Sequence, residues 1–231
     1  MMTIDVSDSL GRRLLRIAIM VAIVVAGSIG YAHAERNEIA VGPSLRALRS
    51  DSANAISDQD LVGPTVSYAR ELGVNVVPGL ELWAAGSFGF GAVDGVMFQS
   101  MTTRARQLAF TVGGRARYEL RRWLAATARV DVGTARTSLE IDAMQRTAAD
   151  HGWGAISATA IGGELVVRVP RSSKLTIGLR LELGYVAATA VELTPSVDDG
   201  DMTIQLPTAA SSFGSLSLSG PSFDIVVFSR F

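Results

Sequence analysis

The stretch RQLAFTVGGRARYELRRWLAATARVDVGTA, Arg106–Ala135, alternates apolar and polar side chains on both sides of a short turn. Before the turn at Arg121-Arg122, one face carries Leu108, Phe110 and Val112, and the other face carries arginines and small residues. A period of two residues is typical of a β-strand, because successive side chains of a strand point to opposite faces. The stretch therefore predicts an antiparallel β-hairpin.

The same rhythm continues through most of the chain after residue 34. Strand-like segments are expected at about residues 39–48, 65–75, 80–88, 106–120, 123–135, 157–169 and 175–187, with an eighth that ends at Phe231. The connections are alternately long and short, and the long ones cover about residues 49–64, 89–104, 136–156 and 194–213. Long extracellular loops that alternate with short periplasmic turns are typical of outer-membrane proteins. The sequence thus predicts an all-β fold, an eight-stranded antiparallel up-and-down transmembrane β-barrel with both ends in the periplasm.

The last expected strand carries a second signal. Apolar side chains fall at Phe223, Ile225, Val227 and Phe231, and Ser229 is the weak member of the series. This spacing resembles the C-terminal assembly signal of bacterial outer-membrane barrels.

Three stretches together resemble one family. They are the terminal strand, the segment GVNVVPGLEL at Gly73–Leu82 and the hairpin at Gly113–Gly133. The expected barrel is similar to the small eight-stranded outer-membrane group of the OmpA transmembrane domain and OmpX. The resemblance implies a monomer in outer-membrane lipid and lipopolysaccharide that contacts the barrel-assembly machinery through its C-terminal strand. OmpA itself continues into a peptidoglycan-binding domain, and no such tether is expected here.

The first 34 residues are expected to be a cleaved signal peptide. Arginines at 12, 13 and 16 precede an apolar stretch at Ile17–Ile29, and Ala32-His33-Ala34 gives the small-x-small cleavage pattern. A membrane-spanning helix needs roughly 20 apolar residues, so this stretch is too short for an anchor. The barrel domain would then cover residues 35–231, exported to the bacterial outer membrane.

Composition limits the remaining choices. The formal net charge of −1 gives no basic excess, which argues against a nucleic-acid partner. Cysteine is absent, so an exported fold would be stable without disulfides. The mean hydropathy of +0.30 comes without a long apolar run after residue 34, which indicates that apolar residues are spread by alternation.

A soluble antiparallel barrel would give the same alternation, with its apolar face turned inward. Bulky residues on the apolar face and small residues on the other face favour the membrane barrel, whose narrow interior suits small side chains. Most aromatic residues fall near expected strand ends, where girdles lie, although Trp83 has the parity of the opposite face.

Parity assigns a set of charged side chains to the barrel interior, because a charge that faces lipid costs about 2–4 kcal/mol for arginine near the bilayer centre. Opposite charges in so narrow a space are expected to pair and to plug the interior, since a selective pore usually carries a ring of one sign. The expected lumen network comprises Arg46, Glu71, Glu81, Arg115, Arg117, Glu119, Arg129, Asp131, Glu164, Arg168, Arg180, Glu182, Asp224 and Arg230.

Two positions break the pattern. Arg70 has the parity of the lipid-facing residues, so either a bulge shifts the register or the side chain reaches the interface. Leu216 and Leu218 are out of phase with Phe223, which suggests a bulge near Gly220.

Signals for other chemistry are weak. His151, the one histidine after the signal segment, lies in an expected loop without a His-x-Ser motif, so catalysis by a serine hydrolase triad has little support. The run Asp198-Asp199-Gly200-Asp201 offers only part of a Ca²⁺ shell, and a solvated acidic loop is the simpler reading. No cofactor or metal site is expected.

The leading hypothesis is a non-enzymatic outer-membrane barrel with a structural or surface-interaction role. The alternatives are a narrow transport barrel for small or apolar solutes and a lipid-modifying enzyme at the rim.

Overall fold

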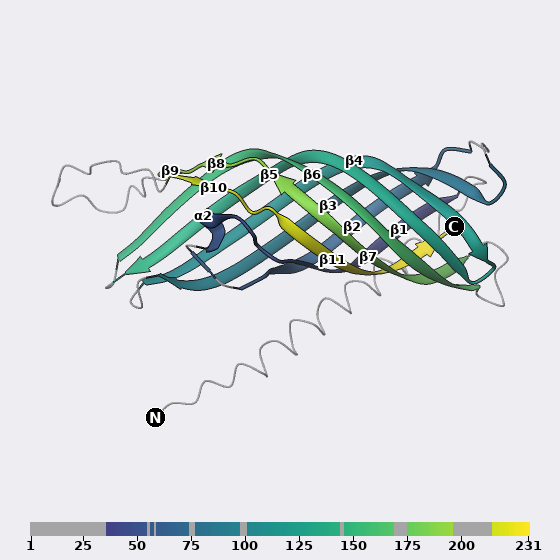
Figure 1. The fold of residues 1–231 in the computed structure, drawn as a ribbon, viewed down its shortest axis with the longest axis horizontal. Helices are drawn as coiled ribbons and strands as arrows, with labels where there is room; N and C mark the ends of the chain where they lie inside the picture. The colour runs from purple at the N-terminus through teal and green to yellow at the C-terminus, as the bar shows by residue number, and fades with distance from the viewer. Residues whose placement is uncertain are drawn as a thin grey trace, which may run out of the picture.

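The chain forms a closed barrel of long, tilted strands (Figure 1). This computed structural model describes residues 36–54, 56–57, 59–73, 77–97, 101–143, 146–168, 175–195 and 214–231. The expected signal peptide at residues 1–34 lies outside the described residues, as does the acidic run at 198–201. No helix in the described part is long and apolar enough to cross a membrane.

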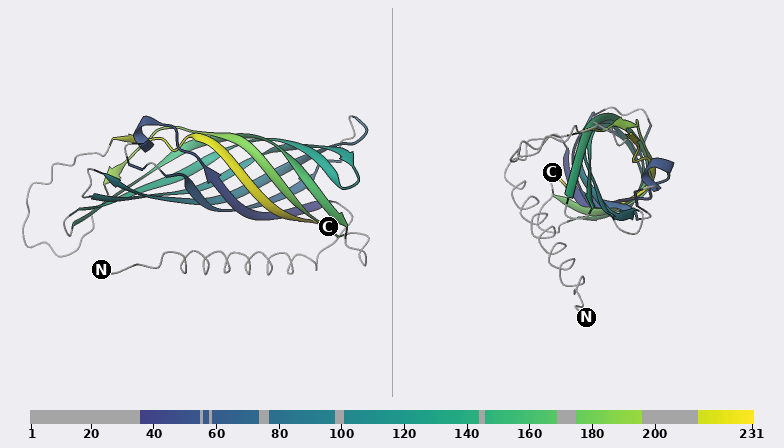
Figure 2. Two further views of the ribbon diagram at one scale, coloured as in Figure 1. Left: turned by 60° about the horizontal axis from the view of Figure 1, so that its bottom comes forward. Right: turned by 90° about the vertical axis from the view of Figure 1, so that its left-hand side faces the viewer.

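Eight strands make the wall. They are β1 (Asn37–Arg46), β2 (Leu61–Glu71), β3 (Leu80–Met97), β4 (Met101–Arg121), β5 (Leu124–Ala143), β6 (Arg146–Arg168), β7 (Thr176–Ala188) and β11 (Gly220–Arg230). Each wall strand pairs antiparallel with the next wall strand along the chain, and β11 pairs with β1 to close the ring. The end-on view in Figure 2 shows the closed wall. The predicted eight-stranded antiparallel up-and-down barrel is confirmed.

The register of the strands sets the width of the barrel. Following the paired residues from Asn37 around the ring leads in turn to Arg70, Ala84, Gly114, Val130, Thr159, Tyr185 and Pro221. The carbonyl of Pro221 accepts a hydrogen bond from the backbone N–H of Ala47, so the path returns ten residues beyond its start. With usual strand spacings, this stagger corresponds to a tilt of roughly 40° and a backbone radius of roughly 8 Å. An interior of that size is filled by side chains.

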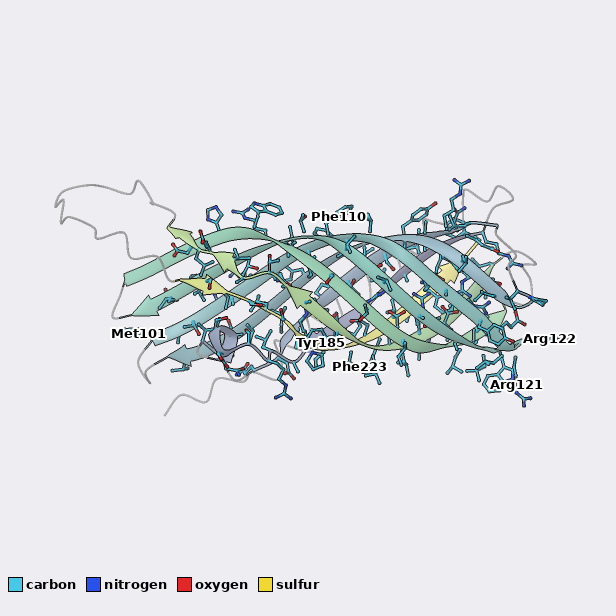
Figure 3. The ribbon with its side chains drawn as sticks, turned by 45° about the horizontal axis from the view of Figure 1, so that its top comes forward. Met101, Phe110, Arg121, Arg122, Tyr185 and Phe223 are labelled. Carbon is cyan, nitrogen blue, oxygen red and sulfur yellow. The ribbon has the colours of Figure 1, made fainter. Side chains whose placement is uncertain are left out.

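The apolar face of the wall points outward. Phe110, Val132, Ile161 and Leu183 are each more than half exposed, and Figure 3 labels Phe110 and Tyr185 along the length of the wall. A soluble barrel would bury these side chains, because exposing so much apolar surface to water is unfavourable. Because the apolar face points outward, the fold is a membrane barrel and not a soluble one.

Neither expected bulge is present. β2 pairs with β1 and with β3 in constant register past Arg70, whose exposed side chain lies near the end of the strand. β11 pairs with β7 in constant register from Gly220 onward. Leu216 and Leu218 share the parity of the buried residues of β11 and are themselves buried, because they point into the barrel. The bulge predicted at Gly220 is therefore wrong.

Two of the four expected long loops are also wrong. Strand β3 continues to Met97 and β4 begins at Met101, so residues 89–104 are mostly strand. Strand β5 continues to Ala143 and β6 begins at Arg146, so residues 136–156 are mostly strand as well. Segment 49–64 holds the short helix α2 (Asp51–Asn54) and the start of β2. The short strands β8 (Val191–Glu192), β9 (Thr194–Pro195) and β10 (Ser215–Leu216) follow β7, and residues 196–213 of the fourth loop lie outside the described residues.

The barrel end opposite the C-terminus is closed by apolar side chains. Helix α2 and strands β8 to β10 gather there (Figure 1), and we take it as the extracellular end because the chain termini and short turns of such barrels lie in the periplasm. The upper apolar cluster inside this end comprises Leu48, Ala53, Ile56, Leu61, Val93, Ala105, Leu139, Val191, Leu193, Leu216 and Leu218.

A substitution at the β1–β11 seam tests the importance of closure. A Cβ atom on Gly42 would lie 1.8 Å from the carbonyl oxygen of Ile225, so the two strands would have to separate. We expect Gly42→Ala to cost about 1–3 kcal/mol of unfolding free energy, as overpacking usually does. The matched control is Gly114→Ala, whose Cβ would have no neighbour nearer than 3.8 Å. Guanidinium unfolding in detergent measures both variants, and equal midpoints would contradict the prediction.

Candidate functional site

The structure places most of the predicted lumen set inside the barrel. Arg115, Arg117, Asp131, Glu164, Arg180, Glu182, Asp224 and Arg230 are buried, and Arg46, Glu71, Glu81 and Arg129 are half-buried. Glu119 is exposed and has no ion pair among the described residues, because it lies beside the hairpin turn, beyond the end of the packed interior. The side chain of Arg168 lies outside the description.

Two carboxylates organise the periplasmic half of the interior. Glu38 accepts hydrogen bonds from Arg115 (Nη1, 2.8 Å) and Arg230 (Nε, 2.7 Å), and Arg180 also donates to it. Glu164 accepts from Nε of Arg180 at 2.8 Å and from Nη2 of Arg230 at 2.7 Å. Two arginines therefore bridge both carboxylates. We call this set the Glu38–Glu164 cluster, which comprises Glu38, Arg115, Arg117, Glu164, Arg180 and Arg230.

Two aromatic rings line the Glu38–Glu164 cluster. The guanidinium of Arg230 lies 5.2 Å from the ring centre of Trp83 and 4.3 Å from that of Phe228. Arg115 lies 5.4 Å from Trp83, and Arg180 lies 5.1 Å from Phe228. A cation over an aromatic face gains roughly 0.5–2 kcal/mol, and the gain is larger where water is excluded. The rings thus stabilise arginines that two carboxylates alone do not neutralise.

A second group of charges lies further along the interior. The nitrogens of Arg129 lie 3.0 Å from Asp131, 3.0 Å from Glu182 and 3.1 Å from Asp224. This Arg129 cluster has an excess of negative charge. The six members of the Glu38–Glu164 cluster have an excess of positive charge, which Glu81, 3.0 Å from Arg117, reduces by one. The two excesses offset each other across adjacent layers.

A small cavity separates the charged layers from the upper apolar cluster. Its volume is about 80 Å³, and its lining includes Arg46, Thr111, Arg129 and Asp224. Polar lining of this kind suits a few water molecules. Arg46 extends beside the cavity and donates to Gln107 (Oε1, 2.7 Å) and to the carbonyl of Leu218 (3.0 Å).

Sequence reasoning missed the carboxylate at the centre. Glu38 has the same parity as Arg46, but the sequence pattern predicts a first strand from Ile39, two residues after β1 begins, and so does not include Glu38. The odd parity of Trp83 was itself informative, because the ring lies inside the barrel and is 1% exposed.

The remaining candidate residue, His151, lies on strand β6 and not in a loop. It pairs with Ser138 of β5, and both side chains belong to the outer face. No hydrogen bond joins the two side chains among the described residues. No carboxylate there contacts His151 either, so a serine hydrolase triad is not assembled.

The outer face completes the description of the wall. Its apolar belt lies between exposed arginines. Arg121 and Arg122 lie at the periplasmic end (Figure 3), and Arg106 and Arg136 lie further along β4 and β5 towards the extracellular end. In the last strand, Ile225 and Val227 of the predicted assembly signal point outward, and Phe231 exchanges two backbone hydrogen bonds with Asn37. A closed eight-stranded antiparallel barrel with a lipid-facing belt is a transmembrane β-barrel of the outer-membrane type.

Comparison with known proteins gives fold-level likeness alone. No family model and no curated protein matches the sequence. Among solved structures, the attachment invasion locus protein Ail of Yersinia pestis has a TM-score of 0.48 and 10% identity, covering 86% of this chain and 100% of Ail. Neisserial surface protein A has a TM-score of 0.43 and 6% identity, covering 85% of this chain and 95% of its own. The translocator domain of autotransporter NalP from Neisseria meningitidis has a TM-score of 0.40 and 9% identity, covering 97% of this chain and 95% of its own.

These identities and scores transfer no residue role or ligand to this chain. The assignment to the small outer-membrane barrels rests on its own strand pairing and on its outward apolar belt.

Removing the central carboxylate should destabilise the barrel strongly. Glu38→Gln takes the charge away from three buried arginines, and breaking a buried ion pair in this way typically costs about 3–5 kcal/mol. The same chemical change at the exposed Glu119 should alter stability by less than about 0.5 kcal/mol. Denaturant unfolding in detergent compares the two variants. Similar midpoints for both would show that the Glu38–Glu164 cluster contributes little.

Proposed function

We propose that this protein is a non-enzymatic outer-membrane barrel that passes no solute and presents an interaction surface outside the cell. The observation that carries the proposal is the sequence of layers inside the wall. The Glu38–Glu164 cluster, the Arg129 cluster and the upper apolar cluster follow one another along a barrel with a radius of roughly 8 Å.

The ion pairs support a closed interior over a conducting one. An ion path usually carries charges of one sign that attract the permeating ion. Here each arginine of the two clusters already lies against a carboxylate within about 3 Å. Opening a path would leave these charges unpaired in a poorly hydrated space, at a cost of several kcal/mol. The upper apolar cluster adds a layer of mostly apolar side chains, which solvate an ion poorly.

The surface role is supported by the unequal lengths of the strands. β3 to β6 have 18 to 23 residues, whereas β1, β2, β7 and β11 have 10 to 13. The four long strands therefore extend past the membrane as a paired sheet, because a bilayer is crossed by roughly 9–11 residues of a tilted strand. Binding sites are commonly built on rigid supports of this kind.

The closed interior predicts the absence of porin-like conductance. Protein reconstituted in planar bilayers should give no stable single-channel steps of porin size, because side chains fill most of the lumen. Reproducible large steps from the wild-type chain would favour the transport alternative. Uptake of small apolar solutes into proteoliposomes tests the same alternative without requiring an ionic current.

The orientation is testable with single cysteines, since the chain contains none. Val96→Cys lies on the expected extracellular end and replaces a side chain that is 63% exposed. Arg122→Cys lies on an exposed periplasmic turn and is the matched control. On intact cells, a membrane-impermeant maleimide should label the first variant, and it should label the second only after the membrane is broken. The reverse pattern would overturn the proposed surface role.

Among the described residues, the cross-strand pair of His151 and Ser138 is the feature that bears on the enzyme alternative. Cells that carry His151→Ala should have an unchanged lipid A mass profile, because the pair lacks the base–nucleophile contact. A shift in lipid A acylation would make the rim an active site.

A further inference from the structure

We propose that the outer wall of the barrel binds lipopolysaccharide through its phosphates, at an arginine patch formed by Arg106 and Arg136. This inference goes beyond the proposed surface role, because it concerns the side of the wall that faces the membrane and not its extracellular tip. It rests on the outer-membrane location and orientation proposed above.

The patch lies at the height where the hydrocarbon layer should end. Towards the extracellular end, the apolar lipid-facing positions of β4 run from Leu120 to Leu108. The lipid-facing positions of β5 run in the same direction from Leu124 to Thr134. At a rise of about 3.3 Å per residue and a tilt of roughly 40°, these stretches span about 25–30 Å. That is the height of the apolar band of such barrels, which is about 25 Å. Arg106 and Arg136 are the next lipid-facing positions on the two strands in the extracellular direction.

The two arginines are neighbours across the β4–β5 ladder. Arg136 pairs in register with Leu108, and Arg106 pairs with Ser138, so their side chains leave the wall at diagonal positions of one face. Side chains at diagonal positions are about 7–8 Å apart at their Cα atoms, a spacing that lets both reach one anionic group.

The charge of the patch is not cancelled by nearby carboxylates. Arg136 is exposed and has no ion pair among the described residues, and Arg106 has only a 4.0 Å contact with Glu140. Arg104, one row further out, is held by Asp94 at 2.8 Å and is therefore less available. Arginine binds phosphate with two parallel hydrogen bonds and remains charged at any physiological pH.

An aromatic residue adjoins the patch. Trp153 of β6 pairs in register with Arg136 and is 65% exposed on the outer face. Tryptophan is enriched where acyl chains meet head groups, since its ring is apolar and its N–H is polar. In the outer leaflet of the outer membrane, that boundary carries the phosphates of lipopolysaccharide. Arginines for the phosphate and an indole for the acyl–sugar boundary fit this lipid.

The test uses the full chain, folded in detergent and titrated with lipid A, with affinity measured by native mass spectrometry. The double variant Arg106→Gln, Arg136→Gln should bind lipid A roughly tenfold or more weakly than wild type, because two charged donors are lost. Its matched control is Arg121→Gln, Arg122→Gln, which removes the same charge from the periplasmic turn and should bind as wild type does. Dephosphorylated lipid A should bind wild type as weakly as lipid A binds the double variant.

Three results would overturn the inference. They are equal lipid A affinity in wild type and in the Arg106/Arg136 variant, an equal loss in the Arg121/Arg122 control, and equal affinity of wild type for phosphatidylglycerol and lipid A. The heat-dependent gel mobility of each variant shows that its barrel is folded, so a failure here is distinct from a failure of the proposed function. Cysteine labelling separately tests the orientation on which the inference depends.

Discussion

The pairing of β1 with β11 is the constraint on which the rest of the structure depends. It turns an open sheet with two unpaired edges into a ring in which backbone groups of the wall pair with neighbouring strands, as a membrane requires. The same pairing fixes the stagger of the strands and therefore the radius. Once the radius is roughly 8 Å, the interior has room for side chains and little else.

Inside so narrow a ring, charged side chains have to neutralise one another. Each ion taken from water costs several kcal/mol, and this cost is recovered only by close partners with good geometry. Glu38 and Glu164 meet the requirement because each contacts three arginines drawn from different strands. Arg230 and Arg180 are the register partners of Glu38 and Glu164 on adjacent strands. Arg115 and Arg117 of β4 instead reach Glu38 of β1 and Glu164 of β6 across the interior, so these contacts also fix which strands face each other. Trp83 and Phe228 contribute by placing polarisable rings against the remaining positive charge.

The sequence predicted what depends on period and parity, and failed where three-dimensional contact decides. Alternation was enough for the strand number, for the closed fold and for the inward direction of residues such as Arg115 and Glu182. It could not show which arginine meets which carboxylate, since that depends on the stagger around the whole ring. Glu38 was missed because the end of a strand is set by its pairing with Phe231, which no local pattern reveals.

The mistaken loop at residues 136–156 has a physical cause on β5, where the alternation reverses within one strand. In the lower part of β5, apolar Val130 and Val132 point outward and charged Asp131 points inward. Past Arg136 the parity is unchanged, but Arg136 points outward and Leu139 points inward. The lower part of β5 therefore follows the rule for a barrel in lipid, and the upper part follows the rule for a barrel in water. A sequence pattern that requires apolar residues on the same face throughout ends where this alternation reverses. The upper part of β5 is therefore mistaken for a loop. The same reversal marks the edge of the hydrocarbon layer on the wall, and the arginine patch lies at that edge because it is the first place where an outward charge is not penalised by lipid.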